Sequence, residues 1–144
     1  MKTSEDPVIV EQSFNTTVDK VWRAITNRDE MIQWFFPNIE TFSPEVGFET
    51  QFEVNVEDRT FTHLWKLTEV VPFKSIKYNW RYQEYAGNSF VNFELFEENG
   101  GVNLKLTHSV IEDFESGIPE FNRDSCVGGW NYFINQNLTK YLEE

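Results

Sequence analysis

The feature that most constrains the fold of this chain is a long stretch, Gly47 to Val110, in which apolar side chains recur at every second position. Successive side chains of a β-strand point to opposite faces, so a period of two indicates strands with one buried face. Turn-forming residues divide the stretch, most clearly Asn99-Gly100-Gly101, and predict five strands joined by hairpins. The stretch therefore predicts an antiparallel sheet with one apolar, aromatic face and one mostly polar face.

The residues before this sheet predict one more strand and two short helices. Val8–Phe14 alternates in the manner of a strand. Either Thr16 or Thr17 can cap the helix that follows, because a threonine hydroxyl accepts a backbone N–H of the first turn. A second helix is predicted over Asp29–Phe35, and Pro37 ends it.

The end of the chain predicts one long helix, from about Asn122 to Tyr141, because apolar residues recur there in steps of three and four. The pair Gly128-Gly129 is unusual in its interior, since each glycine costs a helix about 1 kcal/mol relative to alanine. We interpret the pair as a bend or as a close approach of the helix backbone to the sheet. Together the elements predict a single α+β domain over residues 1–144, in which the long helix covers the apolar face of a curved sheet.

A series of short motifs runs through the chain in a characteristic order: Val18-Asp19-Lys20-Val21-Trp22, Gln33-Trp34-Phe35, Gly47-Phe48, Gly128-Gly129-Trp130, Leu138 and Tyr141-Leu142. Their order and spacing resemble the START-like (SRPBCC) superfamily with the helix-grip fold, and within it the branch of activators of the ninety-kilodalton heat-shock protein's ATPase. The resemblance covers nearly the whole chain. It implies a cavity between sheet and helix, which members use variously for lipids, hormones, polyketides or aromatic molecules. It also implies a chaperone partner, although those activators carry an additional N-terminal domain that we do not expect here.

Charge and cysteine content exclude several classes of partner. The chain has 24 acidic and 12 basic residues, a net charge of −12, and is therefore repelled by nucleic acid and by anionic membrane surfaces. It contains no run of about 18 apolar residues that could cross a bilayer. The single cysteine, Cys126, excludes an internal disulfide and favours a reducing, cytoplasmic location. With only two histidines and no third ligand of matching phase, we predict neither a metal nor a cofactor.

Aromatic residues make up 17% of the sequence, and many of them fall on the predicted inner face of the sheet or on the helix that covers it. Large rings in such a place either fill the interior as core or line a cavity for an apolar ligand. The sequence leaves both outcomes open. For a cavity, the residues that we expect to contact the ligand are Phe52, Val54, His63, Trp65, Tyr78, Trp80, Phe93, His108, Trp130 and Ile134.

Two histidines lie on the apolar phase of their strands, His63 among aromatic residues and His108 near a strand end. Each is either a buried ring with one nitrogen satisfied or a residue that orients a ligand or transfers a proton, and His63 is the better candidate for the second role. The hydroxyls of Tyr78 and Tyr82, and the indoles of the inner face, bond either to a ligand or to backbone carbonyls. Cys126 is either a small buried residue or a thiol whose pKa the helix dipole lowers.

These observations favour a module that binds a small apolar or aromatic molecule between the sheet and the last helix. A cyclase- or hydrolase-type enzyme with His63 as general base is one alternative, and a chaperone-linked interaction protein is the other. We assign no catalytic residue, because no phosphate-binding loop, Ser-His-Asp spacing or carboxylate pair stands out. An exposed sheet edge would allow two copies of the chain to pair as a homodimer.

Overall fold

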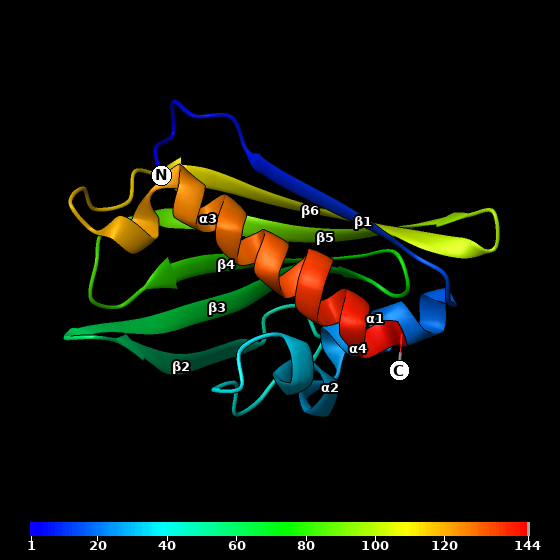
Figure 1. Ribbon diagram of the computed structural model, residues 1–144. Helices are drawn as coiled ribbons and strands as arrows, with labels where there is room; N and C mark the ends of the chain where they lie inside the picture. Colours follow the sequence, from blue (N-terminus) through cyan, green and yellow to red (C-terminus); the bar gives the residue numbers. More distant parts are fainter. Residues whose placement is uncertain (144) are drawn as a thin grey trace.

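The alternating stretch forms five antiparallel strands, as predicted, and the first strand of the chain completes a six-stranded sheet. The computed structural model describes residues 1–143. In chain order the elements are β1 (Val8–Phe14), α1 (Val18–Thr26), α2 (Arg28–Trp34), β2 (Glu49–Val56), β3 (Arg59–Val71), β4 (Ser75–Tyr82), β5 (Asn88–Glu98), β6 (Gly101–Glu112), the 3-10 helix η1 (Pro119–Phe121), α3 (Arg123–Trp130), η2 (Asn131–Leu138) and α4 (Thr139–Glu143). Figure 1 shows the sheet curving around the C-terminal helix. Within the described residues, no helix has the length and apolar character needed to cross a membrane.

The strands are arranged in the order β1-β6-β5-β4-β3-β2, so that hairpins connect β2 through β6 and β1 pairs with β6 at one edge. At this edge Val8 lies opposite His108. The inner phase of the central strands is buried, as Ile76, Tyr78 and Trp80 in β4 illustrate with at most 5% of their surface exposed. The predicted alternation and the α+β helix-grip fold are therefore confirmed.

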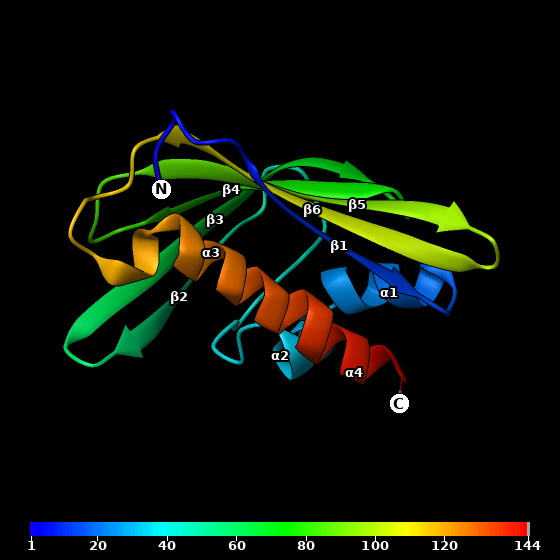
Figure 2. The ribbon, with the colours of Figure 1, turned by 45° about the horizontal axis from the view of Figure 1, so that its top comes forward.

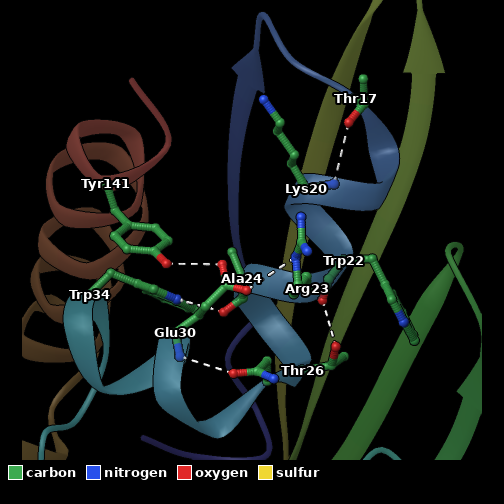
Figure 3. A network of polar contacts seen from close by, with 10 residues as sticks. Thr17, Lys20, Trp22, Arg23, Ala24, Thr26, Glu30, Trp34 and Tyr141 are labelled. Carbon is green, nitrogen blue, oxygen red and sulfur yellow. Dashed lines mark hydrogen bonds and ion pairs between the residues drawn. The ribbon is translucent and has the colours of Figure 1, made fainter. Parts of the chain in front are cut away.

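Side-chain hydrogen bonds hold the two short helices to each other and to the end of the chain (Figure 3). Thr17 caps α1, because its hydroxyl accepts a backbone N–H of the first turn at 3.4 Å. Trp34 in α2 donates its indole N–H to a backbone carbonyl of α1 at 2.8 Å. Tyr141 in α4 donates to the carboxylate of Glu30 in α2 at 2.9 Å. The C-terminal helix is thus anchored at its far end by the α1–α2 pair.

The predicted long helix is present, but its middle is wider than an α-helix. The segments α3 and α4 are α-helical, whereas η2 between them is a π-helix. The side chain of Asn135 in η2 donates to the backbone carbonyl of Glu11 at 3.1 Å, and that of Asn137 donates to the carbonyl of Trp34 at 3.3 Å. The widening of the helix in this segment was not predicted, because apolar spacing does not register contacts of this kind with β1 and α2. π-helical turns are rare and often lie near functional sites.

Of the two interpretations of Gly128-Gly129, a bend or a close approach of helix and sheet, the close approach is wrong. A Cβ atom added at either glycine would meet no other atom within 4 Å. Gly128 is exposed, whereas Gly129 borders a cavity. The physical reason for the error is that empty space, and not the backbone of the sheet, lies next to Gly129.

Candidate functional site

An apolar cavity of about 410 Å³ lies between the inner face of the sheet and the start of the C-terminal helix. Figure 2 shows that α3 and the tip of the β2–β3 hairpin, which both contribute to its wall, lie at the same end of the molecule. The residues that line it are Met1, Phe36, Val54, Val56, Phe61, His63, Trp80, Tyr82, His108, Glu120, Phe121, Ser125, Cys126, Gly129, Trp130 and Phe133. Apolar walls with a few polar groups are typical of small-molecule sites.

A second hollow, of about 430 Å³, lies on the outer face of the sheet. Its wall includes Glu49, Gln51, Lys66, Asn79 and Arg81. Lys66 and Arg81 are exposed, as is usual for the solvent face of an antiparallel sheet. We therefore place the candidate site in the inner cavity.

The structure divides the predicted ligand-contacting residues into two groups. The residues that line the cavity are Val54, His63, Trp80, His108 and Trp130. The residues that are instead buried in the hydrophobic core, outside the cavity wall, are Phe52, Trp65, Tyr78, Phe93 and Ile134. The aromatic inner face therefore does both things that the sequence left open: it fills a core around its middle and lines a cavity at one end.

Several lining residues are absent from the predicted set. Phe61 and Tyr82 share the strand phase of His63 and Trp80, so the alternation carried a signal for them. Phe36 follows the end of α2, and Phe133 lies in the π-helical segment. No strand or α-helix period could place these last two rings, because each depends on irregular backbone.

The ring of His108 is fully engaged by hydrogen bonds. Trp130 donates its indole N–H to Nδ1 at 3.1 Å, and an indole can only donate, so Nδ1 carries no proton. The Nε2–H then donates to Ser89 Oγ at 2.9 Å, while the Ser89 hydroxyl donates to the carbonyl of Trp80 at 2.7 Å. Burial, and then the positive charge of the N-terminus, lower the pKa of His108 to about 3. His108 is therefore a neutral structural residue of the wall, with no ring nitrogen left for a ligand.

His63 differs from His108 because one of its nitrogens has no partner. Its Nδ1 lies 3.1 Å from the carbonyl oxygen of Phe61, which only accepts, so Nδ1 carries the proton and Nε2 presents a lone pair. Among residues 1–143, one side-chain N or O atom, Trp65 Nε1, is completely shielded from solvent and also lacks a hydrogen-bond partner. His63 Nε2 lacks a hydrogen-bond partner too, but it is not completely shielded, so it borders open space. Since His63 lines the cavity, we infer that Nε2 faces it.

The protonation of His63 follows from its surroundings. Burial lowers its pKa to about 4, against the opposing effects of the Phe61 carbonyl and the Glu84 carboxylate. The ring is therefore neutral near pH 7. With so low a pKa it is a weak general base, but it remains a good hydrogen-bond acceptor.

Tyr82 contributes a hydrogen-bond donor to the same wall. Its hydroxyl oxygen accepts the indole N–H of Trp80 at 2.9 Å, and its own O–H has no acceptor among residues 1–143. Burial raises the pKa of Tyr82 above its ordinary value, so the hydroxyl keeps its proton. The expectation that the inner indoles bond to backbone carbonyls is thus wrong for Trp80 and Trp130, whose partners are side chains.

Cys126 lies in the cavity wall, with its sulfur 3.5 Å from Nδ1 of His108. Burial raises the pKa of its thiol to about 12. The idea that the helix dipole makes this thiol acidic is wrong, because desolvation by the apolar wall outweighs it. Within residues 1–143, no three His, Cys, Asp or Glu side chains are grouped so as to hold a metal ion.

An ion pair joins the two sides of the cavity at the hairpin end. Arg59, at the start of β3, bonds both carboxylate oxygens of Glu120 in η1, at 3.0 and 2.6 Å. The hydrogen bond from Arg59 lowers the pKa of Glu120. The α-ammonium group of Met1 donates to the carbonyl of Phe121 beside this pair. The charged groups of the wall therefore lie at η1 and the chain start, and they are paired or hydrogen-bonded.

Solved structures with the same fold cover nearly the whole chain. DynU16, a protein in the dynemicin biosynthetic locus, is 23% identical over 96% of this chain with a TM-score of 0.73, and the chain spans only 48% of that protein. CV1439 from Chromobacterium violaceum is 18% identical, with a TM-score of 0.80 and coverage of 96% and 98% of the two chains. The Aha1 dimer from Colwellia psychrerythraea is 18% identical, with a TM-score of 0.68 and coverage of 96% and 97%.

At these identities the likeness to solved structures shows the fold alone. No curated protein sequence matches the chain. A family model, described as activator of Hsp90 ATPase homolog 1-like protein, matches residues 15–143. The match spans the first helices, the hairpins of the sheet and the C-terminal helix, and the chain therefore belongs to the family of activator of Hsp90 ATPase homolog 1-like proteins.

Proposed function

We propose that this protein binds one small apolar molecule in the cavity between the sheet and α3. The observation that carries the proposal is the cavity of about 410 Å³ with its mostly apolar wall, a size within the range of about 300 to 1,000 Å³ that is usual for ligand sites. Both histidines of the wall are neutral near pH 7. An uncharged ligand therefore meets two neutral imidazoles there.

Gly129 supports the proposal. A Cβ atom at this position would meet nothing within 4 Å, and alanine is favoured over glycine in a helix by about 1 kcal/mol. Alanine would therefore gain helix propensity here without a clash. Glycine forgoes this gain and leaves the cavity wider, which is the arrangement expected of a binding site.

The family membership supports the same function. The chain resembles a superfamily in which the space between sheet and helix holds small molecules, and DynU16, which has the same fold, is a protein of a biosynthetic locus. The proposal is therefore for an apolar or aromatic molecule of a size that fits the cavity.

A cavity-filling variant with a matched control tests the proposal. The probe is N-phenyl-1-naphthylamine, a neutral apolar dye that becomes fluorescent when it leaves water. We expect saturable binding of one dye per chain, a loss of at least tenfold in affinity for Gly129→Leu, and unchanged affinity for Gly128→Leu, whose side chain would lie on the exposed side of the helix. Equal melting temperatures confirm that both variants fold. Absence of saturable binding to the unaltered protein, or equal losses in both variants, would reject the proposal.

A chaperone-linked role is the second candidate, favoured by the family match and by an exposed apolar patch, defined as Pro44 and Phe73, beside the buried ring of Trp22. Phe73 is 48% exposed, has a positive φ of 66° and lies 6.0 Å from the ring of Trp22. A bulky residue in this backbone region is strained.

Calorimetry with purified ninety-kilodalton heat-shock chaperone tests this role. We expect Phe73→Ala to weaken binding at least fivefold and Gly129→Leu to leave it unchanged, whereas no heat of binding to the unaltered chain would exclude the role.

Two expectations from the sequence stay predictions. The first is a homodimer, for which the unpaired edge of β2 is the candidate surface, and sedimentation at several concentrations would detect it. The second is the cytoplasmic location.

A further inference from the structure

The inner wall of the cavity holds two polar groups whose hydrogen-bonding roles are set by their neighbours. His63 presents Nε2 as an acceptor, because Nδ1–H is committed to the carbonyl of Phe61. Tyr82 presents its O–H as a donor, because its oxygen already accepts from Trp80. The wall therefore offers one hydrogen-bond acceptor, His63 Nε2, and one hydrogen-bond donor, the hydroxyl of Tyr82.

His63 and Tyr82 are neighbours, but they do not form a hydrogen bond with each other. Their rings lie 4.8 Å apart and nearly at right angles, at 74°, and no hydrogen bond joins them among the contacts of residues 1–143. A ligand that filled the cavity with carbon alone would expel water from both groups and leave both unpaired. An occupant with a matching polar group avoids this loss.

Charge narrows the chemistry of that polar group. His63 and His108 are neutral near pH 7, and Tyr82 keeps its proton. The charged side chain of the wall, Glu120, is paired with Arg59, and the Met1 ammonium donates to the carbonyl of Phe121. Neither His63 nor Tyr82 carries a charge, so a carboxylate or an amine placed between them would lose hydration without forming an ion pair with either residue.

We propose that the cavity selects uncharged apolar alcohols or phenols, whose hydroxyl oxygen accepts a hydrogen bond from Tyr82 and whose hydroxyl hydrogen is donated to His63 Nε2. This inference rests on the proposed binding function and deepens it. A hydroxyl is the smallest group that both accepts and donates, so it completes the polar pair with a single atom of the ligand. An ether can use only Tyr82, and an unsubstituted hydrocarbon can use neither residue.

Three naphthalenes that differ in one substituent test the selectivity by displacement of the bound N-phenyl-1-naphthylamine. They are 2-naphthol, its methyl ether and 2-naphthoate. We expect 2-naphthol to bind at least tenfold more tightly than either of the other two. Equal displacement by all three, or tighter binding of the carboxylate, would overturn the inference while the dye signal still upheld the binding function. Failure of the dye to bind would instead remove the binding function itself.

Two substitutions then separate the roles of the pair. Tyr82→Phe removes the donor and should weaken 2-naphthol and its ether alike. His63→Leu removes the acceptor, which only 2-naphthol uses, so the ratio between 2-naphthol and ether affinity should fall to near one. Tyr132→Phe, at an exposed position outside the cavity, is the matched control and should change nothing. Retained dye binding in each variant shows that the cavity persists, and an unchanged ratio in His63→Leu would refute the role of Nε2.

Discussion

Trp130 donates its indole N–H to Nδ1 of His108 across 3.1 Å, and this bond fastens α3 to β6 at the wall of the cavity. Both side chains are buried, with 4% of each residue exposed. The bond fixes the tautomer of His108 and, through Nε2, extends to Ser89 in β5. The wall is therefore braced across two strands and one helix by a chain of side-chain hydrogen bonds.

Trp130→Phe should destabilise the protein, because it leaves Nδ1 of His108 buried without its donor. A buried acceptor that loses its partner costs about 1 to 3 kcal/mol, and urea unfolding at pH 7.5 measures the loss. Trp22→Phe is the matched control, since the indole nitrogen of Trp22 makes no hydrogen bond within residues 1–143. The Cys126 thiol lies 3.5 Å from the same nitrogen and can act as a weak donor, so adding Cys126→Ala should deepen the loss. Equal effects of the two tryptophan substitutions would contradict this account.

The stability of the fold should decrease as the pH falls below about 6.5. Burial lowers the pKa of His63 to about 4 and that of His108 to about 3, whereas an unfolded chain titrates near 6.5. The unfolded state therefore binds protons first on acidification, and each histidine lowers the free energy of unfolding by up to about 1.4 kcal/mol per pH unit in this window. Above about pH 7 both rings are neutral in both states, and their contribution is constant.

Urea unfolding at pH 7.5 and pH 5.5 measures this effect before ordinary carboxylates begin to titrate. We expect the free energy of unfolding to fall by roughly 3 kcal/mol between these two values. In His63→Leu the fall should be about half as large, because one titrating ring remains. A free energy of unfolding that is level from pH 7.5 to 5.5 would mean that the two rings are solvated in the folded state.

Breaking the ion pair between Arg59 and Glu120 should change the rate of ligand exchange more than stability. The two side chains are 25% and 30% exposed, and partly exposed pairs contribute at most about 1 kcal/mol. The pair nevertheless joins the β2–β3 hairpin to η1, and both contribute residues to the cavity wall. Arg59→Gln should therefore speed dissociation of the dye several-fold in stopped-flow measurements. Arg28→Gln, which breaks the exposed pair with Asp29, is the control, and equal dissociation rates in both variants would exclude a role for the Arg59 pair.

The fold was predictable from the sequence because each strand has one apolar phase and the register between hairpin neighbours preserves it. Ile76, Tyr78 and Trp80 illustrate this: they alternate in the sequence and are all buried. The same alternation of apolar residues predicts that His63 and Trp80 both lie on the inner face of the sheet. Sequence period could thus identify the face that carries the site.

The extent of the cavity along that face was not predictable in the same way. Trp65 and Trp80 lie opposite each other on neighbouring strands, yet Trp80 lines the cavity and Trp65 is packed in the core. The difference arises from the elements that cover the sheet. Phe36 after α2 and Phe133 in the π-helix contribute rings from irregular backbone, and the absence of a side chain at Gly129 leaves space. These are packing effects between distant segments, which apolar spacing within one segment does not encode.

Gly129→Ala should stabilise the fold, although Gly129 is half-buried. A Cβ atom at 129 meets nothing within 4 Å, and alanine gains about 0.5 to 1 kcal/mol over glycine in a helix. Gly128→Ala should give a similar gain for the same reason. Gly101→Ala should instead destabilise, because its Cβ would lie 2.6 Å from the carbonyl oxygen of Phe14. Urea unfolding of the three variants gives the comparison, and dye affinity should decrease only in Gly129→Ala, whose methyl group enters the cavity. A destabilised Gly129→Ala would show that the space beside the helix is filled.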